Sequence, residues 1–424
     1  MIKIIRDAVN DRAAIFSAVQ ERVDVSATVR EIIEKVRSEG DAALYYYTEK
    51  FDKAKLVSLR VTEEEIKEAV SSVEPKFVEI LKRAAENIRE FHEKQKNSGF
   101  ELRRENGVII GQKVIPVDCA GLYVPGGTAA YPSTVLMDAI PAKIAGCERV
   151  VMVTPPDKFG KVNPVILAAA YVAGVDEIYK VGGAQAIAAL AYGTESVPKT
   201  DKIVGPGNAY VAEAKRQVYG MVSIDMIAGP SEIMIVADGK NRPKDIAADL
   251  LSQAEHDRMA SAVLVTDSEE LAAAVSEELE RQIPELLRAE IARASIDTYG
   301  KIIITDSLDD AIEIANGIAP EHLEICVDEP FEYLAKVKHA GSVFLGRYCP
   351  EALGDYYAGT NHTLPTSGTA KFSSPLSVDD FVKKTQYIYY DKASLGEVCR
   401  EVEYFATKEG LTAHARSAVI RFED

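Results

Sequence analysis

Hydrophobic and polar positions alternate in a regular order along most of the chain. From residue 149 to residue 237, short apolar runs such as RVVMVT and EIMIVAD alternate with longer apolar segments such as PVILAAAYVAG. A short run between turn residues predicts a buried strand, and a longer one predicts a helix. The alternation resumes beyond residue 243 with the runs AVLVTDS, IIITDS, LEICVD and SVFLG. Because this order is typical of parallel sheets covered on both faces, we expect an α/β fold with two doubly wound, incomplete Rossmann-like units.

The two ends of the chain have a helical pattern instead. Residues 28–40 (TVREIIEKVRSEG) place apolar side chains on one helical face, with Thr28 as the N-terminal cap and Gly40 at the end. Residues 75–96 predict a second helix, and we expect His92 to lie on its charged, solvated face. The C-terminal segment, which ends in EGLTAHARSAVIRF, again favours helices. These segments predict helical N- and C-terminal extensions of the α/β core.

Charge and composition exclude several classes of protein. The 424 residues include 49 Lys and Arg against 66 Asp and Glu, a net charge of −17, which argues against a broad nucleic-acid surface. The five cysteines are scattered without a CxxC pair, which argues against a disulfide framework and a Cys-based zinc site. Charges interrupt the N-terminal MIKIIRDAVNDR, and no apolar run is long enough to span a membrane. We therefore expect a cytoplasmic protein without nucleic-acid or membrane partners.

Three glycine loops follow predicted strands. The sequence GPGNAY at 205–210 matches the dinucleotide fingerprint GxGxxG only in part, because Tyr210 replaces the third glycine. Two further glycine loops lie at 125–127 and 182–183. Ligands of open α/β sheets bind outside the carboxyl ends of strands, so these loops predict a nucleotide or substrate crevice. The alternative is that each glycine only makes a tight turn.

One helix end and one polar segment contain candidate metal ligands. Gln253 and His256 in LLSQAEHD are three residues apart on a predicted helix, which places an amide oxygen and an imidazole nitrogen on one face. Asp355 and His362 lie in the aperiodic segment 354–376, and His414 lies near the C-terminus, with Glu409 five residues before it. Nitrogen and oxygen ligands suit zinc or a similar divalent ion, and the absence of HExxH disfavours a zincin protease. On spacing alone, structural roles for these residues remain open.

A carboxylate and an imidazole are adjacent in IAPEHLEI. Glu321 and His322 follow Pro320, which ends the preceding predicted helix, and they precede a predicted strand. Both side chains can be tuned toward a neutral pKa, so the pair suits proton transfer. Neighbours in an extended chain point in opposite directions, so we expect the two to serve different steps. An ordinary loop pair is the alternative.

Several long segments resemble the histidinol dehydrogenase family. The matching runs occur in order from about residue 120 to the C-terminus: GLYVPGGTAAYPSTVLM, VGGAQAIAALAYGTESVPKTDKIVGPGNAYVAEAKRQV, IDMIAGPSEIMIVAD, DLLSQAEHD, PEHLEI, GSVFLG, GDYYAGTNHTLPT and EGLTAHARSAV. The first hundred residues match less clearly, although their helical character is compatible.

The resemblance implies a zinc-containing, NAD-dependent dehydrogenase. Such an enzyme oxidises L-histidinol through L-histidinal to L-histidine, with Glu321 and His322 as the acid/base pair. The implied ligands of one zinc ion per subunit, which holds the substrate imidazole and amine, are Gln253, His256, Asp355 and His414. The implied NAD contacts are Tyr123, Gln185 and Asn208. The implied substrate contacts are Ser231, His362 and Glu409, together with His322 and the zinc ligands.

The resemblance also implies a homodimer of intertwined chains. The C-terminal tail would cross to the partner subunit and bring His414 and Glu409 into its site. We expect three domains: a helical extension (1–20 with 377–424), an α/β domain with the metal and acid/base residues (21–122 with 234–376), and an α/β NAD-binding domain (123–233).

Two other classes of function remain open on the residues alone. A zinc hydrolase, in which metal-bound water attacks an amide or ester, would act without NAD. A non-catalytic α/β scaffold, whose metal only stabilises a dimer, would turn over no substrate. Family members that oxidise other amino alcohols or sulfonates are closer competitors, but Glu321, Glu409 and His414 favour histidinol.

Overall fold

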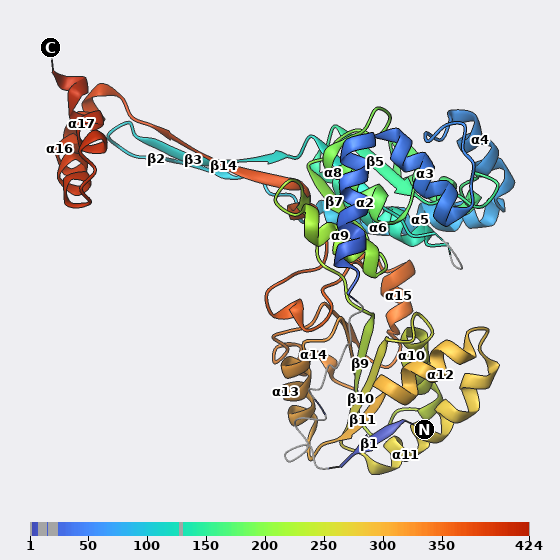
Figure 1. Cartoon of the computed structure of the whole chain (residues 1–424). Coiled ribbons are helices and arrows are strands. Elements are labelled where there is room, and N and C mark those ends of the chain that lie inside the picture. The colour runs from blue at the N-terminus through green and yellow to red at the C-terminus, as the bar shows by residue number, and fades with distance from the viewer. Residues whose placement is uncertain (1, 7–14, 16–23, 127–129, 424) are drawn as a thin grey trace. The chain divides into compact units, whose positions relative to one another are not determined.

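The computed structural model describes residues 2–6, 15, 24–126 and 130–423. The chain forms two compact units, both drawn in Figure 1. Unit 1 comprises Met1–Gln95 and Asp118–Phe381, and unit 2 comprises Lys96–Val117 and Val382–Asp424. Most of the predicted extension 1–20 lies outside the described residues. The three-domain division stays a prediction.

Unit 1 contains two parallel sheets, of which sheet A has the strand order β1-β11-β10-β9-β12-β13. Its strands are β1 (Lys3–Ile5), β9 (Glu232–Ala237), β10 (Ser261–Thr266), β11 (Lys301–Ile304), β12 (His322–Cys326) and β13 (Ser342–Leu345). The helices in this part of the chain are α10 (Pro243–Ala254), α11 (Glu269–Gln282), α12 (Ala289–Tyr299), α13 (Leu308–Ile318), α14 (Pro330–Leu334) and α15 (Glu351–Tyr356). Alternate residues of β9 enter different apolar clusters, Ile233 and Ile235 in one, Met234 and Val236 in the other. Both faces of the sheet are therefore covered.

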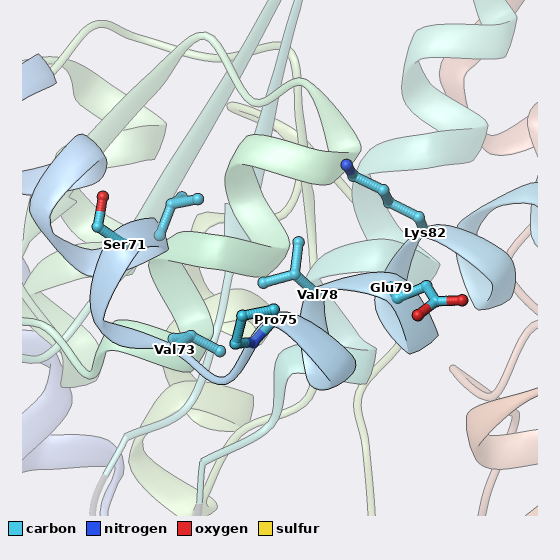
Figure 2. Close-up of a pocket in the computed structure, with 7 residues that line it drawn as sticks. Ser71, Val73, Pro75, Val78, Glu79 and Lys82 are labelled. Carbon is cyan, nitrogen blue, oxygen red and sulfur yellow. The ribbon is translucent and has the colours of Figure 1, made fainter.

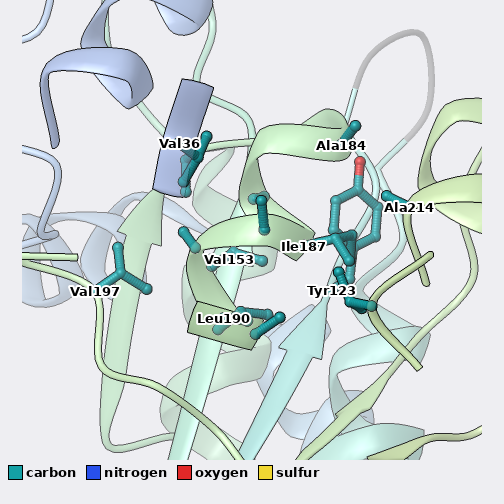
Figure 3. Close-up of a cluster of buried hydrophobic side chains, with 14 of the residues drawn as sticks. Val36, Tyr123, Val153, Ala184, Ile187, Leu190, Val197 and Ala214 are labelled. Carbon is teal, nitrogen blue, oxygen red and sulfur yellow. The ribbon is translucent and has the colours of Figure 1, made fainter. Parts of the chain in front are cut away.

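Sheet B, the second parallel sheet, has the order β6-β5-β4-β7-β8. Its strands are β4 (Cys119–Tyr123), β5 (Arg149–Thr154), β6 (Glu177–Lys180), β7 (Lys202–Val204) and β8 (Ser223–Ile224). The helices of this region are α2 (Ser26–Glu39), α3 (Asp41–Asp52), α4 (Glu63–Ser72), α5 (Pro75–Glu93), α6 (Pro132–Ala145), α7 (Pro164–Ala173), α8 (Gly183–Tyr192) and α9 (Ala209–Val218). Figure 3 shows how Val36 of α2, Val153 of β5 and Ile187 of α8 share one apolar core. This core attaches the N-terminal helices to the sheet.

Two local predictions in the N-terminal helices are wrong. Thr28 lies inside α2 rather than at its cap, because the chain is already helical from Ser26, whose amide donates to Asp24 Oδ1 over 2.9 Å. His92 is fully buried, not solvated. Its Nδ1 atom lies 2.7 Å from Gln95 Oε1, and its Nε2 atom lies 3.4 Å from Asn361 Nδ2. The helical pattern of α5 did not show that a distant loop covers this side chain.

Unit 2 contains an antiparallel sheet and two helices (Figure 1). The strand order is β14-β3-β2, with β14 (Val382–Tyr389), β3 (Ile109–Pro116) and β2 (Phe100–Arg103). The helices are α16 (Lys392–Lys408) and α17 (Thr412–Val419), as the C-terminal pattern predicts. The chain beyond residue 377 is not wholly helical, however, because β14 pairs along its length with β3.

The predicted fold class, an α/β protein with two parallel-sheet units, is confirmed. None of the helices in the described ranges is long and apolar enough to cross a membrane.

Candidate active site

The predicted acid/base pair lies at the amino end of sheet A. His322 begins β12, Glu321 directly precedes it, and β12 pairs with β9, which begins at Glu232. The Glu232 amide donates to Glu321 Oε2 over 2.8 Å, and the Glu232 carbonyl accepts from His322 Nδ1 over 2.9 Å. The main chain of one residue therefore orients both side chains.

The two side chains of the pair converge. His322 Nδ1 lies 3.7 Å from Glu321 Oε2, and the two side chains are only 4% and 9% exposed. The expectation that they point in opposite directions is therefore wrong. The strand begins only at His322, so the alternation of an extended strand does not extend to Glu321.

Both members of the pair have strongly shifted pKa values. Burial raises the pKa of Glu321 to about 8; the carboxyls of Glu232 and Asp355 add to this increase, and His322 opposes it. Burial alone would lower the pKa of His322, but the negative charges of Glu321, Asp355 and Glu351 outweigh burial and raise it to about 10. Such shifts in a buried polar cluster are typical of proton-transfer sites.

The outer nitrogen of His322 is aimed at a second carboxylate. Because a carbonyl oxygen only accepts, Nδ1 carries the proton in the bond to Glu232, and Nε2 is the remaining ring nitrogen. Nε2 lies 3.8 Å from Asp355 Oδ1 and is buried without a hydrogen-bond partner in the described part of the chain. Buried polar atoms are rarely left unpaired, so this nitrogen marks a position for a ligand.

Gln253 and His256 lie beside this pair at the end of α10. His256 Nδ1 donates to Gln253 Oε1 over 2.7 Å, as their spacing predicts. Gln253 is fully buried, and its Nε2 atom lies 3.2 Å from His322 Nδ1. Burial lowers the pKa of His256, although Asp355 opposes this effect. A neutral imidazole is the form that binds a metal.

Asp355 and His362 complete the cluster. Asp355 lies in the last turn of α15, so the segment expected to be aperiodic begins with helix. His362 Nδ1 lies 3.9 Å from Asp355 Oδ1, and its Nε2 atom lies 3.4 Å from Thr134 Oγ1 of α6. Burial acts to raise the pKa of Asp355, but His322 and the other nearby imidazoles hold it below its usual value. Asp355 is therefore an ionised carboxylate among nitrogen atoms.

The structure adds Glu351 to the candidate ligands. One ligand atom from each of His322, Glu351 and Asp355 lies within 4.8 Å of the others, a group that could hold a metal ion. Glu351 is buried, and its Oε2 atom accepts from Ser252 Oγ over 2.8 Å. Glu351 is not among the ligands predicted from the sequence. The signal was its spacing of four from Asp355 on one short helix, which places both carboxylates on the same face.

The remaining predicted substrate residues are not all in this cluster. Ser231 directly precedes β9, next to Glu232. Glu409 caps the end of α16, and His414 lies on α17; both are exposed residues of unit 2. Their expected roles therefore stay predictions.

The predicted NAD residues lie around sheet B. Tyr123 ends β4, and its hydroxyl accepts from the amide of Gly183 at the start of α8 over 3.1 Å. Gln185 is buried on α8. The Asn208 side chain caps α9 by accepting from the amides of Tyr210 and Val211 over 3.0 and 3.2 Å. All three therefore lie at or beyond the carboxyl ends of β4, β6 and β7.

The glycine loops at this edge are closely packed against neighbouring residues. A Cβ atom on Gly126 or on Gly182 would lie 2.5 or 2.6 Å from the ring of Pro155, and one on Gly205 would lie 2.1 Å from the Tyr123 carbonyl oxygen. Glycine is therefore required for packing at these positions, in addition to any role in binding a ligand.

A surface hollow elsewhere in unit 1 is not a candidate active site. It lies between α4 and α5 and is lined mainly by apolar side chains, among them Val73, Pro75 and Val78 (Figure 2). None of the predicted site residues lines it.

Two parallel sheets, with glycine loops at one and a buried acid/base pair at the other, define an α/β enzyme. The family model for histidinol dehydrogenase matches residues 17–422. Histidinol dehydrogenase from Clostridium acetobutylicum is 56% identical, with 100% of this chain and 99% of the relative covered. The enzyme from Geobacillus kaustophilus is 54% identical with the same coverage. The crystal structure of histidinol dehydrogenase from Elizabethkingia anophelis matches with a TM-score of 0.95 and 39% identity, covering 100% of this chain and 98% of that one.

The chain therefore belongs to the histidinol dehydrogenase family and is an oxidoreductase of histidine biosynthesis.

Proposed function

We propose that this chain oxidises L-histidinol through L-histidinal to L-histidine and passes two hydrides in succession to two NAD molecules. The observation that carries the proposal is the convergence of Glu321 and His322, whose polar atoms lie 3.7 Å apart in a buried cluster. Family membership supports the reaction class. The nicotinamide accepts the hydrides, while the protein supplies orientation and proton transfer.

His322 in its neutral form is the base of the first oxidation. The surrounding carboxylates raise the pKa of His322 to about 10, and the positive charge of a zinc ion in the cluster would lower it again. The Glu232 carbonyl orients its ring through Nδ1, and the buried Nε2 atom has no competing hydrogen bond in the described ranges. Nε2 takes the hydroxyl proton of histidinol while the hydride leaves the same carbon, which produces the aldehyde.

Glu321 in its ionised form, which is favoured above its pKa of about 8, is the base of the second oxidation. Its carboxylate removes a proton from water as the water oxygen adds to the aldehyde carbon, and the second hydride leaves the resulting hydrate. The Glu232 amide donates to Glu321 Oε2 and holds the carboxylate next to His322. A general base typically contributes about 10²–10⁴-fold in rate.

Zinc is the metal that best fits the polar cluster. The His322 nitrogen that lacks a partner in the described residues is kept for proton transfer, and the buried, ionised carboxylate of Asp355 supports a cation beside it. Gln253, His256 and Asp355 would hold the zinc ion, with His414 as the fourth ligand. These donors are nitrogen and oxygen atoms, which zinc accepts. The ion would hold the substrate imidazole and amine. Ser231, His362 and Glu409 contact the remainder of the substrate.

NAD binds at the carboxyl edge of sheet B, against Tyr123, Gln185 and Asn208. Support comes from the glycine loops at this edge and from the amino end of α8, which favours a negatively charged pyrophosphate.

The active form is a homodimer in which the C-terminal tail serves the partner's site. Exposure of Glu409 and His414 within a single chain supports this arrangement, because such side chains are accessible to another subunit.

The proposal is tested by adding histidinol and NAD to the zinc-loaded protein and following NADH absorbance, with and without a chelator. NADH formation that the chelator abolishes is expected. Turnover of an amide or ester without NAD would instead indicate a zinc hydrolase. Binding of zinc without any turnover would indicate a scaffold.

A further inference from the structure

A buried carboxyl group outside the catalytic cluster lies between two loops of unit 1. Asp138 is on α6 and is fully buried. Its Oδ1 atom accepts from Thr363 Oγ1 over 3.1 Å. Its Oδ2 atom is buried without a partner in the described ranges, and a Cβ atom on Gly205 would lie 3.1 Å from it. The carboxyl group thus contacts one loop through Thr363 and faces a second loop at Gly205.

One face of α6 holds the first loop. Thr134, Met137 and Asp138 are spaced i, i+3 and i+4, so they lie on the same side of the helix. Each holds one of three successive loop residues: Thr134 lies 3.4 Å from His362, the Met137 carbonyl accepts from Asn361 Nδ2 over 2.7 Å, and Asp138 binds Thr363. The position of His362 therefore depends on the contacts on either side of it.

The second loop is held by a buried ion pair. Lys215 Nζ donates to the Gly205 carbonyl over 3.0 Å, and the Gly205 amide donates to Asp225 Oδ2 over 2.8 Å. Lys215 and Asp225 pair directly, with side chains 2% and 1% exposed. Asn208, which caps α9, is three residues beyond Gly205. The direction of the Asn208 side chain is thus linked to the backbone that faces Asp138.

The charge balance of this region favours a protonated Asp138. Lys215 and Asp225 neutralise each other, so an ionised Asp138 would be an unpaired buried charge. Burial raises the pKa of Asp138 well above its usual value, and the charge of Asp225 raises it further, while Thr363 and Lys215 oppose the shift. A protonated carboxyl group has one oxygen that accepts and one that donates. Since Oδ1 accepts from Thr363, the proton belongs on Oδ2, which faces the second loop.

We propose that Asp138 is a positioning residue, a neutral carboxylic acid that connects the His362 loop to the Gly205–Asn208 loop, so that binding of the substrate alcohol and of the dinucleotide reinforce each other. The inference rests on the proposed function, because it takes His362 as a substrate contact and Asn208 as an NAD contact.

The test is the affinity for NADH, measured by nucleotide fluorescence on the zinc-loaded protein with and without histidinol. NADH and histidinol cannot react with each other, so the readout is binding and not turnover. In the wild-type protein, histidinol should tighten NADH binding about fivefold or more, the lower end of typical coupling between sites. Asp138→Asn should retain most of this coupling factor, because the amide oxygen still accepts from Thr363 and the amide nitrogen occupies the space beside Gly205 without adding a charge. Asp138→Leu, which cannot accept from Thr363, should bring the coupling factor close to one.

Two further variants make the test decisive. Thr363→Val removes the same connection from the other loop and should also bring the factor close to one, so it decides the matter if Asp138→Leu fails to fold. Ser295→Ala is the matched control, because Ser295 is fully buried and donates to the Ala260 carbonyl over 2.8 Å, and Ala260 directly precedes β10. Ser295→Ala should lower the melting temperature, but histidinol should tighten NADH binding as much as in the wild-type protein.

The proposal is overturned if the wild-type protein shows no coupling, or if the Leu and Val variants keep it. Failure of the proposed function would be a different result, the absence of NADH formation from NAD and histidinol in the wild-type protein.

Discussion

The Nε2 atom of His322 lies 3.8 Å from the Oδ1 atom of Asp355. Within the residues that the structure describes, this nitrogen has no hydrogen-bond partner. His322 lies at the start of β12, and Asp355 lies on the short helix α15, 33 residues later in the chain. Their approach brings a candidate proton acceptor and a candidate metal ligand into one buried cluster. Substrate binding and proton transfer can therefore occur within a single set of contacts.

Replacing Glu321 should separate the two half-reactions. Glu321→Gln removes the base that activates water, so oxidation of histidinal supplied directly should fall by about 10²–10⁴-fold. Oxidation of histidinol to histidinal should fall much less, because His322 remains. Glu324→Gln is a matched control, since Glu324 is a buried carboxyl on the same strand. Equal losses in both half-reactions would contradict the assignment.

Replacing Asp355 should reduce metal content. Asp355→Asn replaces an ionised ligand by a neutral amide, so we expect bound zinc to fall at least tenfold at limiting free metal, in line with the loss typical of altered metal-site contacts. Elemental analysis after dialysis measures this. Asp249→Asn is the control. It changes a half-buried aspartate of α10 and should keep the wild-type zinc content. Full zinc content in Asp355→Asn would exclude Asp355 as a ligand.

Asp52 provides a prediction for pH dependence. Burial raises its pKa from 3.8 to about 6, and its Oδ2 atom is buried without a partner in the described ranges. Between pH 3.8 and about pH 6, the Asp52 side chain keeps a proton in the folded state that it has lost in the unfolded state. The free energy of unfolding therefore falls as the pH rises through this range. Asp52→Asn should flatten that decline and raise the melting temperature at pH 7.

A second aspartate serves as the control for this measurement. The bonds to Ser26 hold the pKa of Asp24 below its usual value, which is the opposite shift. Asp24→Asn should therefore not stabilise the protein at pH 7. Identical pH–stability curves for the wild-type protein and Asp52→Asn would contradict the assigned shift.

The C-terminal tail can be tested by mixing defective chains. If His414 acts in the partner's site, a heterodimer of one His414→Asn chain and one His256→Asn chain has one site with both residues intact. We expect up to half of the wild-type activity per dimer, measured on heterodimers isolated with two different tags. Inactive, verified heterodimers would show that the two residues do not come from different subunits.

Most of the fold could be predicted from the sequence because its strands and helices alternate locally. Each βα unit contains its own periodicity and turn residues, so both parallel sheets were expected. The pairing of β14 with β3 was not, since it joins Val382–Tyr389 to Ile109–Pro116 across most of the chain. His92 was misplaced for the same reason, as Asn361 lies far from it in sequence.

The site was only partly predictable. Gln253 and His256 could be grouped by helical spacing, and Glu321 with His322 by adjacency. No local pattern shows that Glu351 and Asp138 are buried, because their burial depends on contacts with residues such as Ser252 and Thr363. The residues next to a carboxyl group in the sequence do not show whether that group is buried or exposed.

The most direct test of the central claim is the stoichiometry of the complete reaction. Limiting histidinol is incubated with excess NAD and the zinc-loaded protein, and NADH and histidine are quantified together. We expect two NADH and one histidine per histidinol consumed, as the two-step oxidation requires. Formation of no NADH, or of one NADH with histidinal as the final product, would contradict it.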